Sequence, residues 1–164
     1  SIYDDIHGKT VLDLGTGAGR LAIGAQLLGA KRVVAVDVDP SAIAVAKSNG
    51  VELGAKIEWV IADIEAIRGS FDTVIMNPPF GTRIQHKDRV FLWKALDVGK
   101  VVYSLHKRST RRYLLDFIAS RNGIVHGLFE FDLEIPHMFS FHEEEKYSVE
   151  VDLYRILLRP KISR

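Results

Sequence analysis

The chain has 164 residues, of which 22 are lysine or arginine and 21 are aspartate or glutamate, so its formal net charge is only +1. This length suits one domain around a single core, and the balanced charge excludes a nucleic-acid binder that depends on a basic field over the whole molecule. The absence of cysteine and of any apolar run near the roughly 18 residues of a membrane span excludes disulfides, thiolate catalysis and cysteine-ligated zinc, and it predicts a cytoplasmic protein.

Strand-like and helix-like segments alternate along the first two thirds of the chain. Nearly continuous apolar runs at residues 10–14 and 32–38 are typical of parallel strands that are buried on both faces. Asp39 is expected to cap the helix that begins at Pro40. The remaining strands are expected at 56–62, 71–76 and 101–105, and the helices at 20–28, 40–48, 90–96 and 113–120.

The last third of the chain, from Ile124 to Leu158, is expected to form two long antiparallel strands around a loop that contains Pro136. Between the third and fourth strands, residues 63–69 are too few for a long crossover helix. No repeat or linker divides the chain, so we place no domain boundary in residues 1–164. The pattern predicts an α/β fold with a doubly wound, mostly parallel, seven-stranded sheet and a C-terminal antiparallel hairpin.

A glycine-rich segment, DLGTGAGR at residues 13–20, follows the first strand and opens a helix. Its glycines allow a tight turn and the close approach of a ligand. Asp37 ends the second strand at roughly the 20-residue spacing of carboxylates that bind a ribose diol. A nicotinamide fingerprint would need glycine where the chain has Arg20, whereas a nucleoside with an amino-acid tail, such as S-adenosylmethionine, needs no pyrophosphate site. The alternative is an ordinary turn in which Asp37 caps a helix.

A further acid, Asp63, ends the third strand. It could accept a hydrogen bond from an adenine amino group, or it could cap a short turn. The carboxyl ends of parallel strands meet at one edge of the sheet, where open α/β sheets bind ligands. We therefore expect Asp37, Asp63 and the glycine loop to line one crevice.

The segment TVIMNPPFGT at residues 73–82 ends a buried strand abruptly. Proline is excluded from central strands, so the strand must end at Met76 and present Asn77 at the edge of the sheet. The Asn77 side-chain oxygen and the Pro78 carbonyl could accept hydrogen bonds from the amine of an adenine and free its lone pair, while Phe80 offers a face for stacking. Because methyl transfer from a sulfonium mainly requires an in-line nucleophile, no general base is needed. The alternative is a proline-terminated strand with Phe80 in the core.

Together these motifs resemble those of the archaeal and eukaryotic family of small-subunit ribosomal RNA N6-adenosine methyltransferases. The segments that carry the resemblance are DLGTGAGRLAIGA, VDVDP, FDTVIMNPPFGT, VYSLHKRST and EVDLYR. The resemblance implies a class I, Rossmann-like methyltransferase fold, S-adenosylmethionine as cofactor and adenine N6 in ribosomal RNA as acceptor. The implied catalytic residues are Asn77, Pro78, Pro79 and Phe80. The implied cofactor-binding residues are Asp13, Gly15, Thr16, Gly17, Ala18, Gly19, Asp37, Val38, Asp63 and Ile64.

The resemblance also implies a partner protein, and this chain differs from the family at its N-terminus. The family carries N-terminal helices that this chain lacks, so residues 1–164 are expected to be a single methyltransferase domain without them. Eukaryotic members use a small zinc-binding activator protein, and the third strand is implied to lie at the edge of the sheet. We expect the activator to dock there, because an apolar edge strand invites pairing with another chain. The alternative is that Trp59 of this strand packs under a helix.

The segment HKRSTRR at residues 106–112 places cations before a helix whose expected N-cap is Ser109 or Thr110. Cations oppose the helix dipole there, whereas a phosphate would offset that cost. The candidate RNA-binding residues are therefore Lys107, Arg108, Arg111 and Arg112. Polar residues 82–88 are expected to be mobile.

No metal site is predicted, and His137 and His142 are interpreted as loop or core histidines. The sequence leaves other functions open. Guanine-N2, protein-glutamine and DNA-adenine methyltransferases share a similar proline motif, and a non-catalytic RNA-binding assembly factor could keep the cofactor pocket. A nicotinamide oxidoreductase is disfavoured by Arg20.

Overall fold

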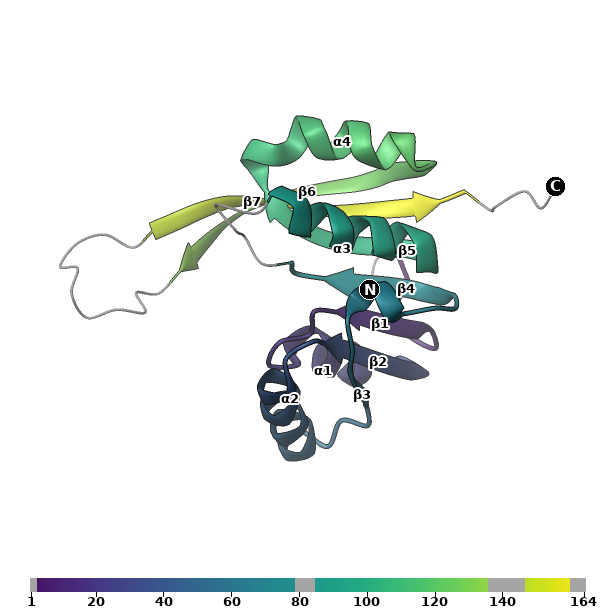
Figure 1. Ribbon diagram of the computed structural model, residues 1–164, viewed down its shortest axis with the longest axis vertical. Helices are drawn as coiled ribbons and strands as arrows, with labels where there is room; N and C mark the ends of the chain where they lie inside the picture. The colour runs from purple at the N-terminus through teal and green to yellow at the C-terminus, as the bar shows by residue number, and fades with distance from the viewer. Residues whose placement is uncertain (1–2, 79–84, 136–146, 160–164) are drawn as a thin grey trace.

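A computed structural model describes residues 3–78, 85–135 and 147–159 of the chain (Figure 1). Within these residues one sheet contains seven strands. They are β1 (Thr10–Leu14), β2 (Arg32–Asp37), β3 (Glu58–Ile61), β4 (Phe71–Met76), β5 (Gly99–Lys107), β6 (Gly123–Ile135) and β7 (Tyr147–Leu158). The helices are α1 (Arg20–Leu27), α2 (Pro40–Glu52), α3 (Gln85–Val98) and α4 (Arg111–Ser120), with short 3₁₀ turns η1 (Ile64–Ala66) and η2 (Arg108–Thr110).

The strand order is β3-β2-β1-β4-β5-β7-β6. The strands from β3 to β5 pair in parallel, whereas β7 pairs antiparallel with both β5 and β6. This order confirms the predicted doubly wound sheet, the C-terminal hairpin and the position of the third strand at an edge. The order reverses between β1 and β4, so the crevice for a ligand is expected at their carboxyl ends.

Helices cover both faces of the sheet, and each covered face has its own core (Figure 1). On one face α3 and α4 pack over the central strands, and their buried side chains include Leu92, Leu96 and Ile118. On the other face Ala22 and Ala25 of α1 pack on valine, alanine and isoleucine side chains of the strands. Alternating side chains of each central strand enter the two cores, which explains why these strands are apolar throughout.

Most predicted elements are confirmed with small shifts of their ends. The fourth strand ends at Met76, and the Asp39 side chain caps α2 by accepting a hydrogen bond from the Ser41 amide at 2.8 Å. The helix expected at 90–96 begins earlier, because α3 begins at Gln85, and the mobility expected of residues 82–88 stays a prediction. Glutamine and lysine have good helix propensity, which favours this extension. In the described part of the chain no helix is long and apolar enough to cross a membrane.

Candidate active site at the carboxyl edge of the sheet

Parallel pairing brings the predicted site residues to one edge of the sheet. The register pairs Leu14 of β1 with both Val36 of β2 and Met76 of β4, and it pairs Asp37 with Ile61 of β3. The residue after Leu14 opens the glycine loop, and the residue after Met76 is Asn77. Since neighbouring strands lie about 5 Å apart, the start of the glycine loop and Asn77 are neighbours at this edge.

The glycine loop has the backbone conformation that its composition predicts. Gly15, Gly17 and Gly19 all have positive φ angles, of 71°, 54° and 83°, which other residues adopt only with strain. A Cβ atom at Gly15 would lie 2.7 Å from the ring of Phe91, so α3 packs directly on the loop. A Cβ atom at Gly17 would meet no described atom within 4 Å. The loop is therefore closely packed at its start and open at its middle.

Asp37 holds the middle of the loop. Its Oδ2 atom accepts a hydrogen bond from the Gly17 amide at 2.9 Å, and its Oδ1 atom accepts one from the Asp39 amide at 3.0 Å. The helix cap is Asp39, so the alternative in which Asp37 caps a helix is wrong. Each oxygen of the Asp37 carboxylate keeps a second lone pair, which suits it to accept hydrogen bonds from a diol.

Asp13 is buried at the base of the loop and supports it through Thr16, a residue of the loop. Asp13 is only 1% exposed, and its Oδ2 atom accepts hydrogen bonds from the Thr16 hydroxyl at 2.6 Å and from the Ala22 amide at 3.0 Å. Burial, above all, raises the pKa of Asp13 to about 6, and the nearby charge of Asp37 adds to the increase. The Oδ1 atom of Asp13 is buried without a hydrogen-bond partner among the described residues. Direct contact of these two side chains with a cofactor stays a prediction.

The remaining predicted cofactor residues follow the ends of two strands, with Val38 directly after β2 and with Asp63 and Ile64 at the start of η1. Asp63 is exposed and caps η1, because its Oδ1 atom accepts a hydrogen bond from the Glu65 amide at 2.8 Å. Ile64 is buried, whereas Val38 is 67% exposed. Asp63 therefore caps a short turn. Its other carboxylate oxygen could still accept the predicted hydrogen bond from an adenine amino group.

The proline motif is described only in its first half. Asn77 is exposed directly after β4, and Pro78 is buried behind it. Pro79 and Phe80 lie outside the described residues, as do His137 and His142. The described part places an exposed amide on a buried proline support, at the edge where the glycine loop begins.

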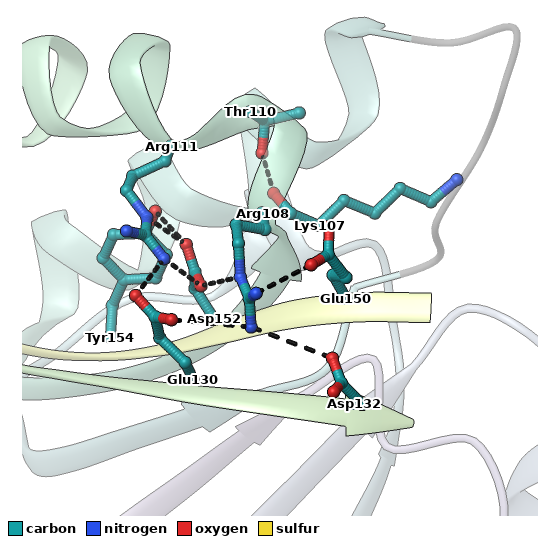
Figure 2. A network of polar contacts seen from close by, with 9 residues as sticks. All are labelled: Lys107, Arg108, Thr110, Arg111, Glu130, Asp132, Glu150, Asp152 and Tyr154. Carbon is teal, nitrogen blue, oxygen red and sulfur yellow. Dashed lines mark hydrogen bonds and ion pairs between the residues drawn. The ribbon is translucent and has the colours of Figure 1, made fainter. Parts of the chain in front are cut away.

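The basic segment before α4 forms a network with the β6–β7 hairpin (Figure 2). Arg111 donates two hydrogen bonds of 2.7 Å to the carboxylate of Asp152 and a third, of 2.7 Å, to Glu130. Arg108 donates to Glu150 at 2.8 Å and to Asp152 at 3.3 Å. Asp152 is fully buried, and these arginines, Arg111 first, hold the pKa of its carboxyl below its usual range.

This network changes the interpretation of the four predicted RNA-binding residues. Arg108 and Arg111 form ion pairs within the fold, whereas the side chain of Lys107 points away from the network in Figure 2. Arg112 is exposed on the first turn of α4. Asp152 is not among the residues predicted from the sequence, although acids alternate with apolar residues in both hairpin strands and so share one face of the hairpin.

Trp59 packs inside the fold. A Cβ atom at Gly19 would lie 2.9 Å from the Trp59 ring, and one at Gly50 would lie 3.0 Å from it. The alternative that Trp59 packs under a helix is therefore confirmed. Ile61 at the end of the same edge strand is 54% exposed.

Comparison with known proteins identifies the family. An rRNA N(6)-adenosine-methyltransferase of Drosophila melanogaster, Mettl5, is 38% identical over 163 residues, which cover 94% of this chain and 76% of the relative. The METTL5 protein of Danio rerio is 38% identical over 160 residues, covering 93% and 77%. This chain belongs to the rRNA N(6)-adenosine-methyltransferase family.

Solved structures agree with this family. A protein of Pyrococcus horikoshii, described as a candidate RNA methyltransferase, superposes with a TM-score of 0.84 at 42% identity, covering 94% of this chain and 76% of that chain. A model of the ribosomal protein L11 methyltransferase (PrmA) family matches residues 4–78, the segment from the N-terminal strands to the proline motif. The solved structure confirms the class I methyltransferase fold, and the curated relatives confirm the family that the motifs resemble.

Proposed function

We propose that this methyltransferase transfers a methyl group from S-adenosylmethionine to the N6 amine of an adenine in RNA, most simply ribosomal RNA in the cytoplasm. The observation that carries the proposal is the β1–β4 register, which sets the glycine loop beside Asn77. The glycine loop suits a nucleoside cofactor, and Asn77 suits the amine of a base. Their adjacency is what a direct methyl transfer requires.

The residues of the loop fit the cofactor. The carboxylate of Asp37 is fixed by two backbone amides and has lone pairs for a ribose diol. The open side of Gly17 leaves room for the ligand to approach the backbone. Asp63, Ile64 and Val38 would flank the adenine ring. The cofactor, when bound, would supply a methyl group that its sulfonium already activates; it would leave as the thioether S-adenosylhomocysteine, and the methylated amine would release one proton to solvent.

Asn77 and Pro78 orient the acceptor in this scheme. The N6 amine of adenine is a weak nucleophile, because its lone pair is delocalised into the ring. The Asn77 side-chain oxygen and the Pro78 carbonyl would accept hydrogen bonds from the two N–H groups of this amine, which holds it in a geometry that frees the lone pair. Pro79 and Phe80 complete the proposed site, Pro79 by stiffening the backbone and Phe80 by stacking on the base.

RNA is the substrate that the relatives support. The Drosophila and Danio proteins are named as rRNA methyltransferases. Lys107 and Arg112 are the cations best placed to contact a phosphate backbone, since Arg108 and Arg111 already hold acids. A second acceptor is a protein glutamine, because a protein of Methanocaldococcus jannaschii named as an N5-glutamine methyltransferase is 36% identical over 98 residues, although these cover only 58% of this chain.

Mass spectrometry of nucleosides tests the acceptor. Ribosomal RNA is incubated with the protein and S-adenosylmethionine and is then digested. N6-methyladenosine is the expected product. N2-methylguanosine, or methylation of a protein alone, would overturn the proposed substrate.

Substitution of Asn77 by alanine tests the catalytic role. Turnover should fall by about a hundredfold or more, since an orienting hydrogen bond in the transition state is lost. Cofactor affinity should stay within about threefold, because Asn77 binds the acceptor and not the cofactor. A variant with wild-type turnover would show that Asn77 does not orient the amine.

A partner protein is proposed for the edge strand β3. A small zinc-binding activator could add a strand along residues 58–61, because this edge has no neighbouring strand among the described residues. Ile61→Asp should abolish co-purification with the activator, while Val51→Asp on the neighbouring α2 should not. Equal retention by both variants would exclude this edge. Ile61 is a better probe than Trp59, whose substitution would disturb the core.

A further inference from the structure

Asn49 of α2 makes a long-range contact with the glycine loop. Its Nδ2 atom donates a hydrogen bond of 2.9 Å to the carbonyl of Ala18, which lies 31 residues earlier in the sequence. Both groups are partly buried. Ala18 stands between Gly17 and Gly19, so the bond fixes the backbone between two residues with positive φ angles.

Three side chains form hydrogen bonds with three consecutive loop residues, and each of these side chains comes from a different element. Asp13 of β1 accepts a hydrogen bond from the Thr16 hydroxyl, and Asp37 of β2 accepts one from the Gly17 amide. Asn49 of α2 is the third side chain, and it alone of the three is the donor, with the Ala18 carbonyl as acceptor. Asp37 also faces the proposed ribose position, whereas Asn49 approaches the loop from the side of α1 and α2.

The position of Asn49 is itself well defined. Ile43 and Ala46 of α2 are buried, and Gly50 allows the Trp59 ring to approach within 3.0 Å of the position of a Cβ atom. The end of α2 is therefore pressed against the sheet beside the loop. Asn49 also lines a hollow of about 280 Å³ together with Arg20 and Glu52. The side chain can lose its bond to Ala18 without a large collapse of the core.

We propose that Asn49 is a positioning residue, which sets the affinity for the cofactor by fixing the Ala18 carbonyl and with it the direction of the Gly17 and Gly19 backbone. The inference rests on the proposed function, because it takes the glycine loop as the cofactor site. Asn49 does not touch the reacting atoms. Its loss should weaken cofactor binding and leave the rate at saturation almost unchanged.

Calorimetric titration of S-adenosylmethionine into the wild type and three variants tests the role. Asn49→Leu removes the donor, and its dissociation constant should rise about tenfold, as expected for a lost hydrogen bond and a loosened loop. The KM for the cofactor should rise by a similar factor, while kcat stays within about twofold. Ser48→Ala, an exposed neighbour on α2, should bind like the wild type.

A pH series separates a specific hydrogen bond from general damage to α2. The Asn49→Asp variant presents a carboxylate to the Ala18 carbonyl at pH 8, so its affinity should be as low as that of Asn49→Leu or lower. Near pH 4 about half of an aspartate carboxyl with its ordinary pKa of about 3.9 is protonated and can donate, so its deficit relative to the wild type should shrink by about threefold or more. The deficit of Asn49→Leu should not change with pH.

The charged neighbours do not disturb this comparison. Arg20 and Glu52 in the hollow, and Asp13 and Asp37 around the loop, are present in the wild type and in every variant, so their effects largely cancel in the ratio. Wild-type affinity in both Asn49→Leu and Asn49→Asp would overturn the positioning role. A pH-independent deficit in Asn49→Asp would also overturn it. Absence of binding by the wild type would instead refute the proposed function.

Discussion

The buried His106 predicts how acid acts on the stability of this protein. The side chain lies on β5 and is 3% exposed. Its Nε2 atom lies 2.5 Å from the Ser104 hydroxyl, and its ring meets that of Tyr154 edge to face at a centroid distance of 5.8 Å. Burial lowers the pKa of His106 from 6.5 to about 4, although the charge of Asp152 acts in the opposite direction.

The sign of the effect follows from proton linkage. Between pH 6.5 and pH 4 the unfolded chain protonates this histidine and the folded chain does not, so acid favours unfolding. The contribution of His106 to stability is complete above the unfolded pKa and is lost as the pH falls through this range. With the two pKa values above, lowering the pH from 7.5 to 5 costs about 2 kcal/mol.

In the wild type the titration of Asp13 offsets much of the stability that His106 loses in acid. Its folded pKa is raised from 3.8 to about 6, so the folded state binds a proton before the unfolded chain does. Lowering the pH to 5 therefore adds about 1 kcal/mol of stability from this group. The net change of the wild type is small for these two groups, and a variant is needed to separate them.

The variant His106→Gln removes the titrating ring and keeps a nitrogen near the Ser104 hydroxyl. Urea unfolding of both proteins at pH 7.5 and pH 5 gives the difference in their free energies of unfolding at each pH. This difference should shift by about 2 kcal/mol in favour of the variant at pH 5. The contribution of Asp13 is present in both proteins and cancels. A difference that changes by less than about 0.5 kcal/mol would refute a neutral buried histidine.

Three further predictions follow from the site and its supports. Arg111→Ala should lower the melting temperature by about 5 °C, because Asp152 loses its main partner. Arg112→Ala should leave the melting temperature unchanged. It should instead reduce the salt dependence of RNA binding, which filter-binding titrations at several ionic strengths measure. Asp37→Ala should raise the dissociation constant of S-adenosylmethionine by about tenfold or more in calorimetry. Asp39→Ala should instead remove the cap of α2, which lowers the free energy of unfolding in urea by about 1 kcal/mol. Gly15→Ala should lower the free energy of unfolding by about 2–4 kcal/mol, because backbone strain and the contact of the new Cβ with Phe91 add. Gly54→Ala is the control, since it has similar backbone strain and no described atom near the new Cβ. Equal losses of stability in the two variants would exclude a contribution from the contact with Phe91.

Local patterns predicted the elements and much of the site. The end of β4 at Met76 and the Asp39 cap depend on proline and on neighbouring residues, so the sequence specifies them directly. The positive φ angles of the glycine loop follow in the same way from its composition. Asp37 was selected by its spacing from the loop, and the structure joins its carboxylate to the Gly17 amide.

Predictions about single charges were less complete, because an isolated side chain does not reveal its partner. Arg108 and Arg111 looked like free cations in the sequence, yet both bind acids of the β6–β7 hairpin. Trp59 looked like a docking residue on an edge strand, yet its ring packs against two glycines. In each case the deciding contact joins segments that are far apart in the chain.

The sequence by itself determined the alternation of strands and helices, the glycine turn, the abrupt end of β4 before the two prolines and the membership of the family, because each depends on residue order within a short segment or on motifs that recur in relatives. Only the tertiary structure decided that Asn49 holds the Ala18 carbonyl and that Asp152 binds the two arginines, over separations of 31 to 44 residues. These contacts depend on strand order and register, which bring distant side chains within hydrogen-bond distance.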